Sequence, residues 1–240
     1  MTSIRENVQR VQENIAAACA RSGRAVSEVT LVAVTKTHPI ETVLEAIDAG
    51  LQHFGENRVE ESELKIPGVK AQSAEEITWH MIGHVQSRKA KAVAPLFDVV
   101  HSVDSAKLAR KLAGALPEGK ILRVLLQMNV SGEASKEGID AVGWMSDPAA
   151  RERLAGEVRE IAEQPGLDVR GLMTIAPIVD DPEDARPIFA ALRGLRDHLA
   201  EVVGMPLFEL SMGMTDDYGA AIEEGATLVR VGRAIFGERL

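Results

Sequence analysis

Leu31-Val32-Ala33-Val34-Thr35-Lys36 is a short apolar, β-branched run that ends on a lysine. A run of this composition predicts a buried strand, and Pro39 soon after it predicts a turn. A lysine at the mouth of a strand has two interpretations. Either it caps the strand and points its ammonium into water, or it is partly desolvated and becomes a nucleophile toward carbonyls.

Strand-like and helix-like segments alternate along the rest of the chain. An amphipathic helix is predicted over residues 1–22 with Gly23 as its C-cap, and a long loose segment spans 131–138. Helices separate nearly all the strands. The later strands are predicted at 51–55, 77–83, 97–103, 121–130, 169–174, 208–211 and 227–232, and the later helices at 39–49, 86–94, 105–115, 147–164, 184–203 and 218–224.

This alternation predicts an α/β protein. Eight strands with intervening helices in 240 residues indicate a closed (β/α)8 barrel, a TIM barrel, with an extra N-terminal helix. The main alternative is an open doubly wound sheet, but no G-x-G-x-x-G motif follows the first strand. Without an internal repeat or linker, we expect residues 1–240 to form one domain.

Composition restricts the compartment and the partners. The single cysteine, Cys19, and the absence of a signal-peptide pattern or a long apolar run predict a cytoplasmic protein without a membrane segment. A net charge of −9 argues against nucleic-acid binding. The six histidines show no metal-ligand spacing, so no metal is expected, and His80 and His101 are predicted to form hydrogen bonds in the core or at the barrel mouth.

The carboxyl ends of the predicted strands carry the polar residues of interest. Active sites of (β/α)8 barrels lie at these ends, and a phosphate site is frequently built from the loops after strands seven and eight. Segments 211–217 and 229–237 supply glycines and small hydroxyls there. Each segment alone also fits a simple helix cap or turn. Lys36, Asn57, Gly83, Ser211 and Gly232 all fall at strand ends.

A lysine combined with a phosphate site indicates a phosphorylated carbonyl compound. Pyridoxal phosphate fits, and so does the substrate of a class I sugar-phosphate aldolase. Arg230 bears on this choice, because pyridoxal sites place an Asp or Arg beside the pyridine nitrogen. Arg230 equally fits a salt bridge to a carboxylate at the barrel mouth, such as Glu209.

A family resemblance narrows these alternatives. Residues 79–89, Trp-His-Met-Ile-Gly-His-Val-Gln-Ser-Arg-Lys, resemble the signature segment of the pyridoxal phosphate homeostasis proteins, which are related to the barrel domain of alanine racemase, fold type III. The resemblance covers essentially the whole chain, with its segments in family order. The other segments are 33–37 (Ala-Val-Thr-Lys-Thr), 54–57 (Phe-Gly-Glu-Asn), 171–173 (Gly-Leu-Met), 211–217 and 229–237.

The resemblance implies one pyridoxal phosphate, held as an internal aldimine by Lys36. It also implies Arg230 at the pyridine nitrogen and Asn57 near the ring. Many members have a threonine where this chain has Arg233, so a hydroxyl contact to phosphate is in question at that position. The implied phosphate contacts are Ser211, Gly213 and Gly232.

The implied function is intracellular homeostasis of pyridoxal phosphate, by buffering or delivery to apo-enzymes, without robust catalysis. An amino-acid racemase is the alternative. In alanine racemase a tyrosine from an additional C-terminal domain of the partner subunit acts opposite the lysine. This chain ends at Leu240, so we expect that domain to be absent, and Tyr218, the one tyrosine, to be a packing residue. A monomer is expected.

Overall fold

The strand that ends before Lys36 is one of the wall strands of a closed parallel barrel. In this computed structural model, which describes residues 2–133 and 137–237, β1 (Thr30–Val34) pairs in parallel with β2 (His53–Glu56) and with β9 (Leu228–Val231). A further parallel pairing joins β4 (Val99–Val103) to β5 (Leu122–Asn129) and closes the sheet. The other barrel strands are β3 (Thr78–Met81), β7 (Leu167–Met173) and β8 (Glu209–Ser211).

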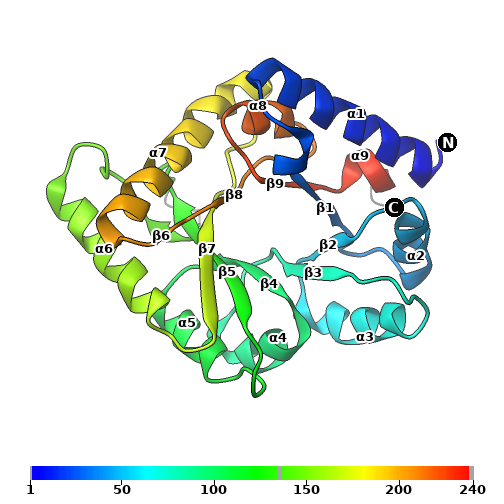
Figure 1. The fold of residues 1–240 in the computed structure, drawn as a ribbon, viewed down its shortest axis with the longest axis horizontal. Coiled ribbons are helices and arrows are strands. Elements are labelled where there is room, and N and C mark those ends of the chain that lie inside the picture. The colour runs from blue at the N-terminus through cyan, green and yellow to red at the C-terminus, as the bar shows by residue number, and fades with distance from the viewer. Residues whose placement is uncertain (1, 134–136, 238–240) are drawn as a thin grey trace.

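Helices surround the barrel, as Figure 1 shows. The predicted (β/α)8 architecture and its extra N-terminal helix, α1, are therefore confirmed. Gly23 ends α1 in the left-handed conformation, with φ of 68°, as expected of a C-cap. The helices are α1 (Ile4–Ser22), α2 (Ile40–Asp48), α3 (Val59–Lys70), α4 (Ala90–Leu96), α5 (Ala106–Ala113), α6 (Pro148–Ala162), α7 (Arg186–Val203), α8 (Tyr218–Glu223) and α9 (Arg233–Phe236), with 3-10 turns η1 (Val26–Glu28), η2 (Ser87–Lys89) and η3 (Pro182–Ala185).

Among the α-helices and strands, α3, α9 and β6 were not predicted. Helix α3 has a buried face that includes Ser62 and Lys65, and it contains Pro67, so no apolar stripe marks it in the sequence. A two-residue strand, β6 (Ile139–Asp140), pairs with the end of β5 outside the barrel. It follows the predicted loose segment 131–138, of which residues 134–136 lie outside the described residues.

The apolar core has two parts. The larger part lies between the strands and the surrounding helices. The smaller consists of Val32, Leu125, Met173 and Leu228. Since β1 and β5 are not neighbours in the sheet, these side chains meet only across the barrel interior. Among the helices described for residues 2–133 and 137–237, none has the length and apolar character needed to cross a membrane.

Candidate functional site

Five of the six predicted site residues end or follow four adjacent strands, and the sixth, Arg230, lies within β9. The sheet order β2-β1-β9-β8 places Asn57, Lys36, Gly232 and Ser211 after or at the ends of consecutive strands. Carboxyl ends of parallel strands share one edge of a sheet, so these positions converge although up to 196 residues separate them in sequence (232 − 36). A Cβ on Gly232 would lie 3.4 Å from the Val34 carbonyl oxygen, so the end of β9 contacts the segment that leads to Lys36.

The backbone on both sides of the half-buried Lys36 is held by hydrogen bonds. The Thr35 carbonyl accepts from Lys65 Nζ at 2.7 Å, and the Thr35 hydroxyl donates to Glu56 Oε1 at 2.7 Å. The Thr37 backbone N–H donates to Glu61 Oε1 at 2.7 Å, and Thr37 adopts a φ of 68°, uncommon for a non-glycine residue. This turn therefore fixes where the Lys36 side chain leaves the backbone.

A buried ion pair holds that turn. Lys65 Nζ lies 2.7 Å from Glu56 Oε1 and 2.6 Å from Glu61 Oε1, and Lys65 is 5% and Glu56 0% exposed. Burial raises the pKa of Glu56, and the hydrogen bonds from Lys65 and Thr35 offset part of that rise. The sequence analysis missed this pair, because Lys65 lies on the unpredicted α3. Its one sequence signal is the i,i+4 spacing of Glu61 and Lys65.

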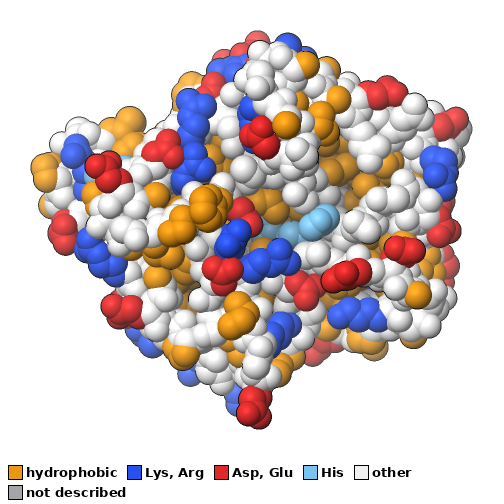
Figure 2. Space-filling view, in the orientation of Figure 1, with side chains coloured by type: hydrophobic (Ala, Val, Ile, Leu, Met, Phe, Trp, Pro, Cys, Tyr) orange, Lys and Arg blue, Asp and Glu red, His pale blue; other side chains and the backbone are white. Residues whose placement is uncertain are grey.

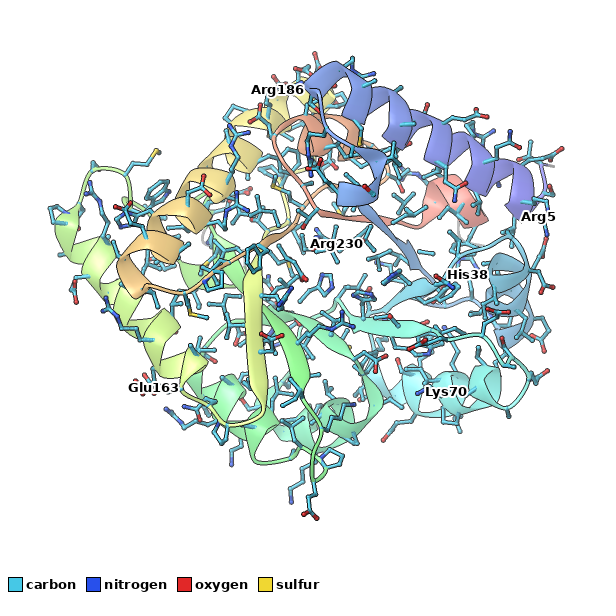
Figure 3. All side chains as sticks on the ribbon, in the orientation of Figure 1. Arg5, His38, Lys70, Glu163, Arg186 and Arg230 are labelled. Carbon is cyan, nitrogen blue, oxygen red and sulfur yellow. The ribbon has the colours of Figure 1, made fainter. Side chains whose placement is uncertain are left out.

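Arg230 lies inside the barrel and contacts the end of β8. Its Nη1 donates to Ser211 Oγ at 2.5 Å and its Nη2 to the Thr174 carbonyl at 2.9 Å. Figure 3 shows Arg230 in the middle of the molecule. Burial lowers the pKa of Arg230 to about 10, so the guanidinium stays charged at neutral pH. The suggested salt bridge to Glu209 is wrong, because Glu209 pairs with Arg170 at 3.5 Å.

The loop after β8 is closed around Gly213. This residue has φ of 89°, and a Cβ on it would lie 2.6 Å from the Ala221 Cβ and 2.9 Å from the Tyr218 Cα. Its carbonyl accepts from the Arg230 backbone N–H at 3.0 Å, which ties the loop to β9. Only glycine meets both demands, and it lets the loop pack directly against α8.

Asp217 in this loop and Arg233 at the start of α9 are both bonded within the protein. Asp217 begins α8 without a side-chain cap on the helix, and its Oδ1 instead accepts from the Met214 backbone N–H at 2.5 Å. Burial raises the pKa of Asp217. Arg233 binds the exposed Asp216 at 2.5 Å, which places its charge at the surface of this loop. Tyr218 is buried and its hydroxyl accepts from Asn14 Nδ2 of α1 at 3.1 Å.

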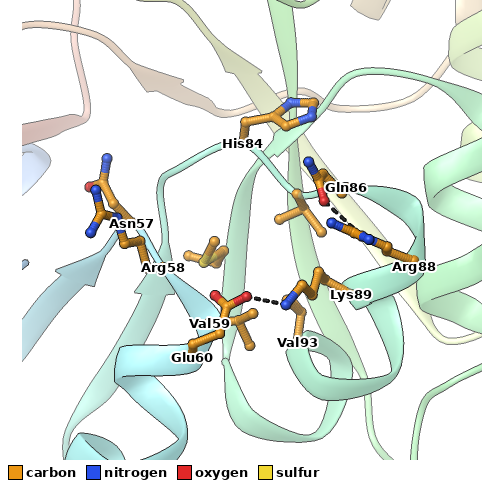
Figure 4. A pocket seen from close by; sticks show the side chains of 11 residues that line it. Asn57, Arg58, Val59, Glu60, His84, Gln86, Arg88, Lys89 and Val93 are labelled. Atoms are coloured by element: carbon orange, nitrogen blue, oxygen red, sulfur yellow. Dashed lines mark hydrogen bonds and ion pairs between the residues drawn. The ribbon is translucent and has the colours of Figure 1, made fainter.

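Asn57 supplies a buried polar atom on the opposite side of Lys36. Its Oδ1 is buried and has no hydrogen-bond partner among the residues that the structure describes. Gly83, after β3, is required beside it, because a Cβ there would lie 2.3 Å from the Asn57 carbonyl oxygen. Asn57 also lines a pocket of about 470 Å³ together with Arg58, His84 and Arg88 (Figure 4).

The groups gathered here are of the kinds that suit a phosphorylated pyridine aldehyde. Lys36 has an amine, Gly213 and Gly232 have backbone without side chains, and Arg230 is a buried cation. Nothing in this set suits a metal. Among residues 2–133 and 137–237, no group of three or more His, Cys, Asp or Glu is arranged to hold a metal ion.

This barrel with its strand-end lysine falls in a known class. The sequence model of the family described as alanine racemase, N-terminal domain, matches residues 6–240, and the chain belongs to this family.

Relatives that match over their full length narrow the assignment further. A pyridoxal phosphate homeostasis protein of Vibrio cholerae is 41% identical over 241 residues, which cover 100% of this chain and 98% of that protein. The chain is thus a member of the pyridoxal phosphate homeostasis protein family.

Solved structures agree with the observed fold. A protein of unknown function from Bifidobacterium adolescentis is 41% identical, with a TM-score of 0.83 over 97% of this chain and 94% of that one. PipY of Synechococcus elongatus, solved with pyridoxal phosphate bound, is 35% identical, with a TM-score of 0.78 over 95% of this chain and 100% of its own.

Proposed function

We propose that this protein binds pyridoxal phosphate at the strand-end site and buffers or delivers it inside the cell. The observation that carries this proposal is the alignment of Lys36, Gly232 and Ser211 on adjacent strands, with Arg230 buried between them. The name of the Vibrio cholerae relative and the ligand in the PipY structure support it. Bound pyridoxal phosphate supplies an electrophilic aldehyde, for which Lys36 is the nucleophile on this chain.

The other site residues have separable roles in this proposal. Ser211 and the backbone N–H groups at Gly213 and Gly232 bind the phosphate, since they follow or end the neighbouring strands β8 and β9. Asn57 contacts the ring through the buried Oδ1 that lacks a partner in the described residues. Arg230 faces the pyridine nitrogen, where a permanent positive charge keeps that nitrogen unprotonated.

These roles favour holding the cofactor over turnover. An unprotonated pyridine withdraws electrons weakly, which disfavours abstraction of a proton from a bound amino acid. Racemisation also needs a second acid–base group, and the hydroxyl of Tyr218 is bonded to Asn14 on α1. No observation therefore favours the racemase alternative. Apo-enzymes that need pyridoxal phosphate are the proposed recipients.

Two measurements on the loaded protein test this function. Mixed with a pyridoxal-phosphate-dependent apo-enzyme, it should restore that enzyme's activity while its own absorbance near the visible–ultraviolet edge declines. Incubated with amino acids in deuterium oxide, it should introduce no deuterium at the α-carbon at enzyme-like rates. A protein that exchanges α-protons rapidly, and loses that exchange in Tyr218→Phe, would be a racemase instead.

A further inference from the structure

Three histidines form a continuous hydrogen-bonded chain through the barrel to Ser211. His53 Nδ1 lies 3.0 Å from His80 Nε2, and His80 Nδ1 lies 2.8 Å from His101 Nε2. His101 Nδ1 lies 2.8 Å from Ser211 Oγ, the atom that also accepts from Arg230. The predicted hydrogen-bonding roles of His80 and His101 are thus confirmed, and four side chains from β2, β3, β4 and β8 form one path.

The path crosses the barrel interior from Ser211, which pairs in register with Leu228 at the start of β9, to His53 at the start of β2. His53 lines a pocket of about 470 Å³ with Gln12, Thr30 and Gln52, on the side where β1 and β2 begin. Histidine side chains reach the surface in the hollowed centre of the face drawn in Figure 2, with Lys, Arg and carboxylate side chains beside them on the left and below.

All three imidazoles are neutral at physiological pH. Burial lowers the pKa of His80 and His101 well below the usual range, with nearby positive charge adding to the effect. Burial also lowers the pKa of His53, and Arg123 of β5 adds to it. A neutral imidazole has one N–H donor and one bare nitrogen acceptor. At each contact between two rings, one nitrogen must carry the hydrogen and the other must accept it. The N–H donors of the three rings must therefore all point in the same direction along the histidine chain.

Two senses of the chain follow, and they differ at Ser211. In the outward sense, Ser211 donates to His101 and the donors run toward His53, which is protonated on Nε2. In the inward sense, His53 carries its proton on Nδ1, and His101 donates to Ser211. Arg230 and His101 then occupy both acceptor sites of the hydroxyl, so its hydrogen must point to a third group.

We propose that His53, His80 and His101 are a tautomer relay, in which a phosphate group at the strand-end site selects the inward sense and so sets the tautomer of His53 at the other end of the histidine path. The inference rests on the proposed function, since it needs a phosphate that accepts from Ser211. On switching inward, each imidazole takes a proton on one nitrogen and releases one from the other. Water at the site returns one proton to Ser211, and His53 releases one to water in its pocket.

A relay explains why polar groups occupy the barrel interior. Burying three imidazoles costs free energy that apolar side chains of similar size would not, unless every polar atom is bonded. The chain satisfies the buried nitrogens of His80 and His101 only when its donors are aligned. The fold therefore requires the donors to be aligned. Which of the two directions they take depends on the groups bonded to Ser211 and His53 at the two ends.

The test is long-range proton–nitrogen NMR of protein with ¹⁵N-labelled histidine, which distinguishes the two neutral tautomers. Titration with inorganic phosphate, and separately with pyridoxal phosphate, should move His53 from the Nε2–H toward the Nδ1–H form. A His53 tautomer that stays unchanged while the amides of Gly213 and Gly232 shift would overturn the relay alone. Absence of any shift at those amides would overturn the proposed function and the relay with it.

Ser211→Ala separates the relay from a general effect of ligand binding. Without the hydroxyl, phosphate still meets the backbone of Gly213 and Gly232, but it has no connection to His101. The amides should therefore still shift, more weakly, while the His53 tautomer no longer responds. If His53 responds equally in Ser211→Ala, the signal travels by another route and the relay is wrong.

The reverse effect is required by thermodynamic linkage. Protonated His53 carries hydrogen on both nitrogens, so it must donate to His80 and enforce the inward sense. The affinity for inorganic phosphate should then rise by about three- to ten-fold, the effect of one hydrogen bond, as pH falls through the His53 pKa. The charged or titratable groups that face His53 among the described residues are His80 of β3 and Arg123 of β5.

Two variants isolate this effect from the titration of phosphate itself. His53→Ala removes the outer end of the chain, while Gln52→Ala alters the same pocket without touching the chain. The ratio of phosphate affinities, wild type to variant, should change with pH for His53→Ala and stay constant for Gln52→Ala. A constant ratio for both variants would contradict the relay.

Discussion

At the scale of single residues, the position of Lys36 depends on groups that never touch a ligand. Thr35 and Thr37, on either side of it, are bonded to Lys65, Glu56 and Glu61. A buried ion pair stabilises little by itself, but removing one partner leaves the other charge buried without compensation. The Lys65 ammonium is thus a positioning group for Lys36 as well as a determinant of stability.

Lys65→Met tests this dependence on the buried pair. The variant leaves Glu56 unpaired at 0% exposure, so the free energy of unfolding should fall by about 3–5 kcal/mol. Urea unfolding measures it, and Lys70→Met, an exposed position at the end of the same helix, is the matched control with little effect. A change in Lys65→Met no larger than in the control would mean that the pair does not hold the turn.

Gly213→Ala tests the closed loop of the phosphate site. Both its φ of 89° and the 2.6 Å approach of a new Cβ to Ala221 require the loop to move. We expect the free energy of unfolding to fall by about 1–3 kcal/mol and the affinity for phosphate to fall markedly. Isothermal titration calorimetry measures the affinity. Gly156→Ala in α6 has open space around its Cβ and should stabilise by about 0.5–1 kcal/mol. Unchanged phosphate affinity in Gly213→Ala would exclude this loop from the site.

At the scale of elements, α1 packs against the helices that follow β8 and β9. It packs against α8 and α9, and its Asn7 donates from Nδ2 to the Ile235 carbonyl of α9 at 2.8 Å, in a buried position. Arg24, just after α1, donates to the Ile222 and Ala226 carbonyls at 2.8 Å each. The extra helix therefore holds the ends of the segments that follow β8 and β9.

Asn7→Ala should loosen this contact. The Ile235 carbonyl loses its side-chain donor in a buried environment, which costs about 1–3 kcal/mol of unfolding free energy. Gln9→Ala on the exposed side of α1 is the control, expected within about 0.5 kcal/mol of the wild type. If thermal unfolding does not separate the two variants, the Asn7 bond contributes nothing to the docking of α1.

Elements with a regular pattern could be predicted from the sequence, and those with buried polar faces could not. The apolar runs predicted the barrel strands. Their predicted ends placed Lys36, Asn57, Ser211 and Gly232 at strand ends, where the structure also has them. Helix α3 was not predicted because its buried face includes Lys65, a residue that is expected to be exposed unless its partner Glu56 is known. The histidine chain was not predicted because its members are also buried polar residues. Its contacts join residues 21 to 110 positions apart, and no local spacing encodes them.

At the scale of the whole molecule, the buried histidines make stability depend on pH. The pKa values of His80 and His101 are lowered in the folded state, so below about pH 6.5 the unfolded chain binds more protons than the folded one. The contribution of these two histidines to the free energy of unfolding is therefore fully present above that pH and is lost as the pH falls. The raised pKa values of Glu56 and Asp217 act in the opposite direction.

The expected result is a decline of the unfolding free energy between pH 7.5 and 5.5. Each buried histidine contributes up to about 1.4 kcal/mol per pH unit below 6.5, and the two carboxyls reduce the total. Urea titrations at three pH values measure the slope. Equal stability at pH 7.5 and 5.5 would mean that these imidazoles are not held neutral in the core.

The central claim is that Lys36 holds pyridoxal phosphate at the ends of β1, β8 and β9. Borohydride reduction of the loaded protein, followed by peptide mass spectrometry, tests it most directly. We expect one label per chain, on the peptide that contains Lys36, and a much weaker affinity for the cofactor in Lys36→Ala than in Lys107→Ala on the exposed side of α5. A label on another lysine of the wild-type protein, with Lys36 unmodified, would contradict the account.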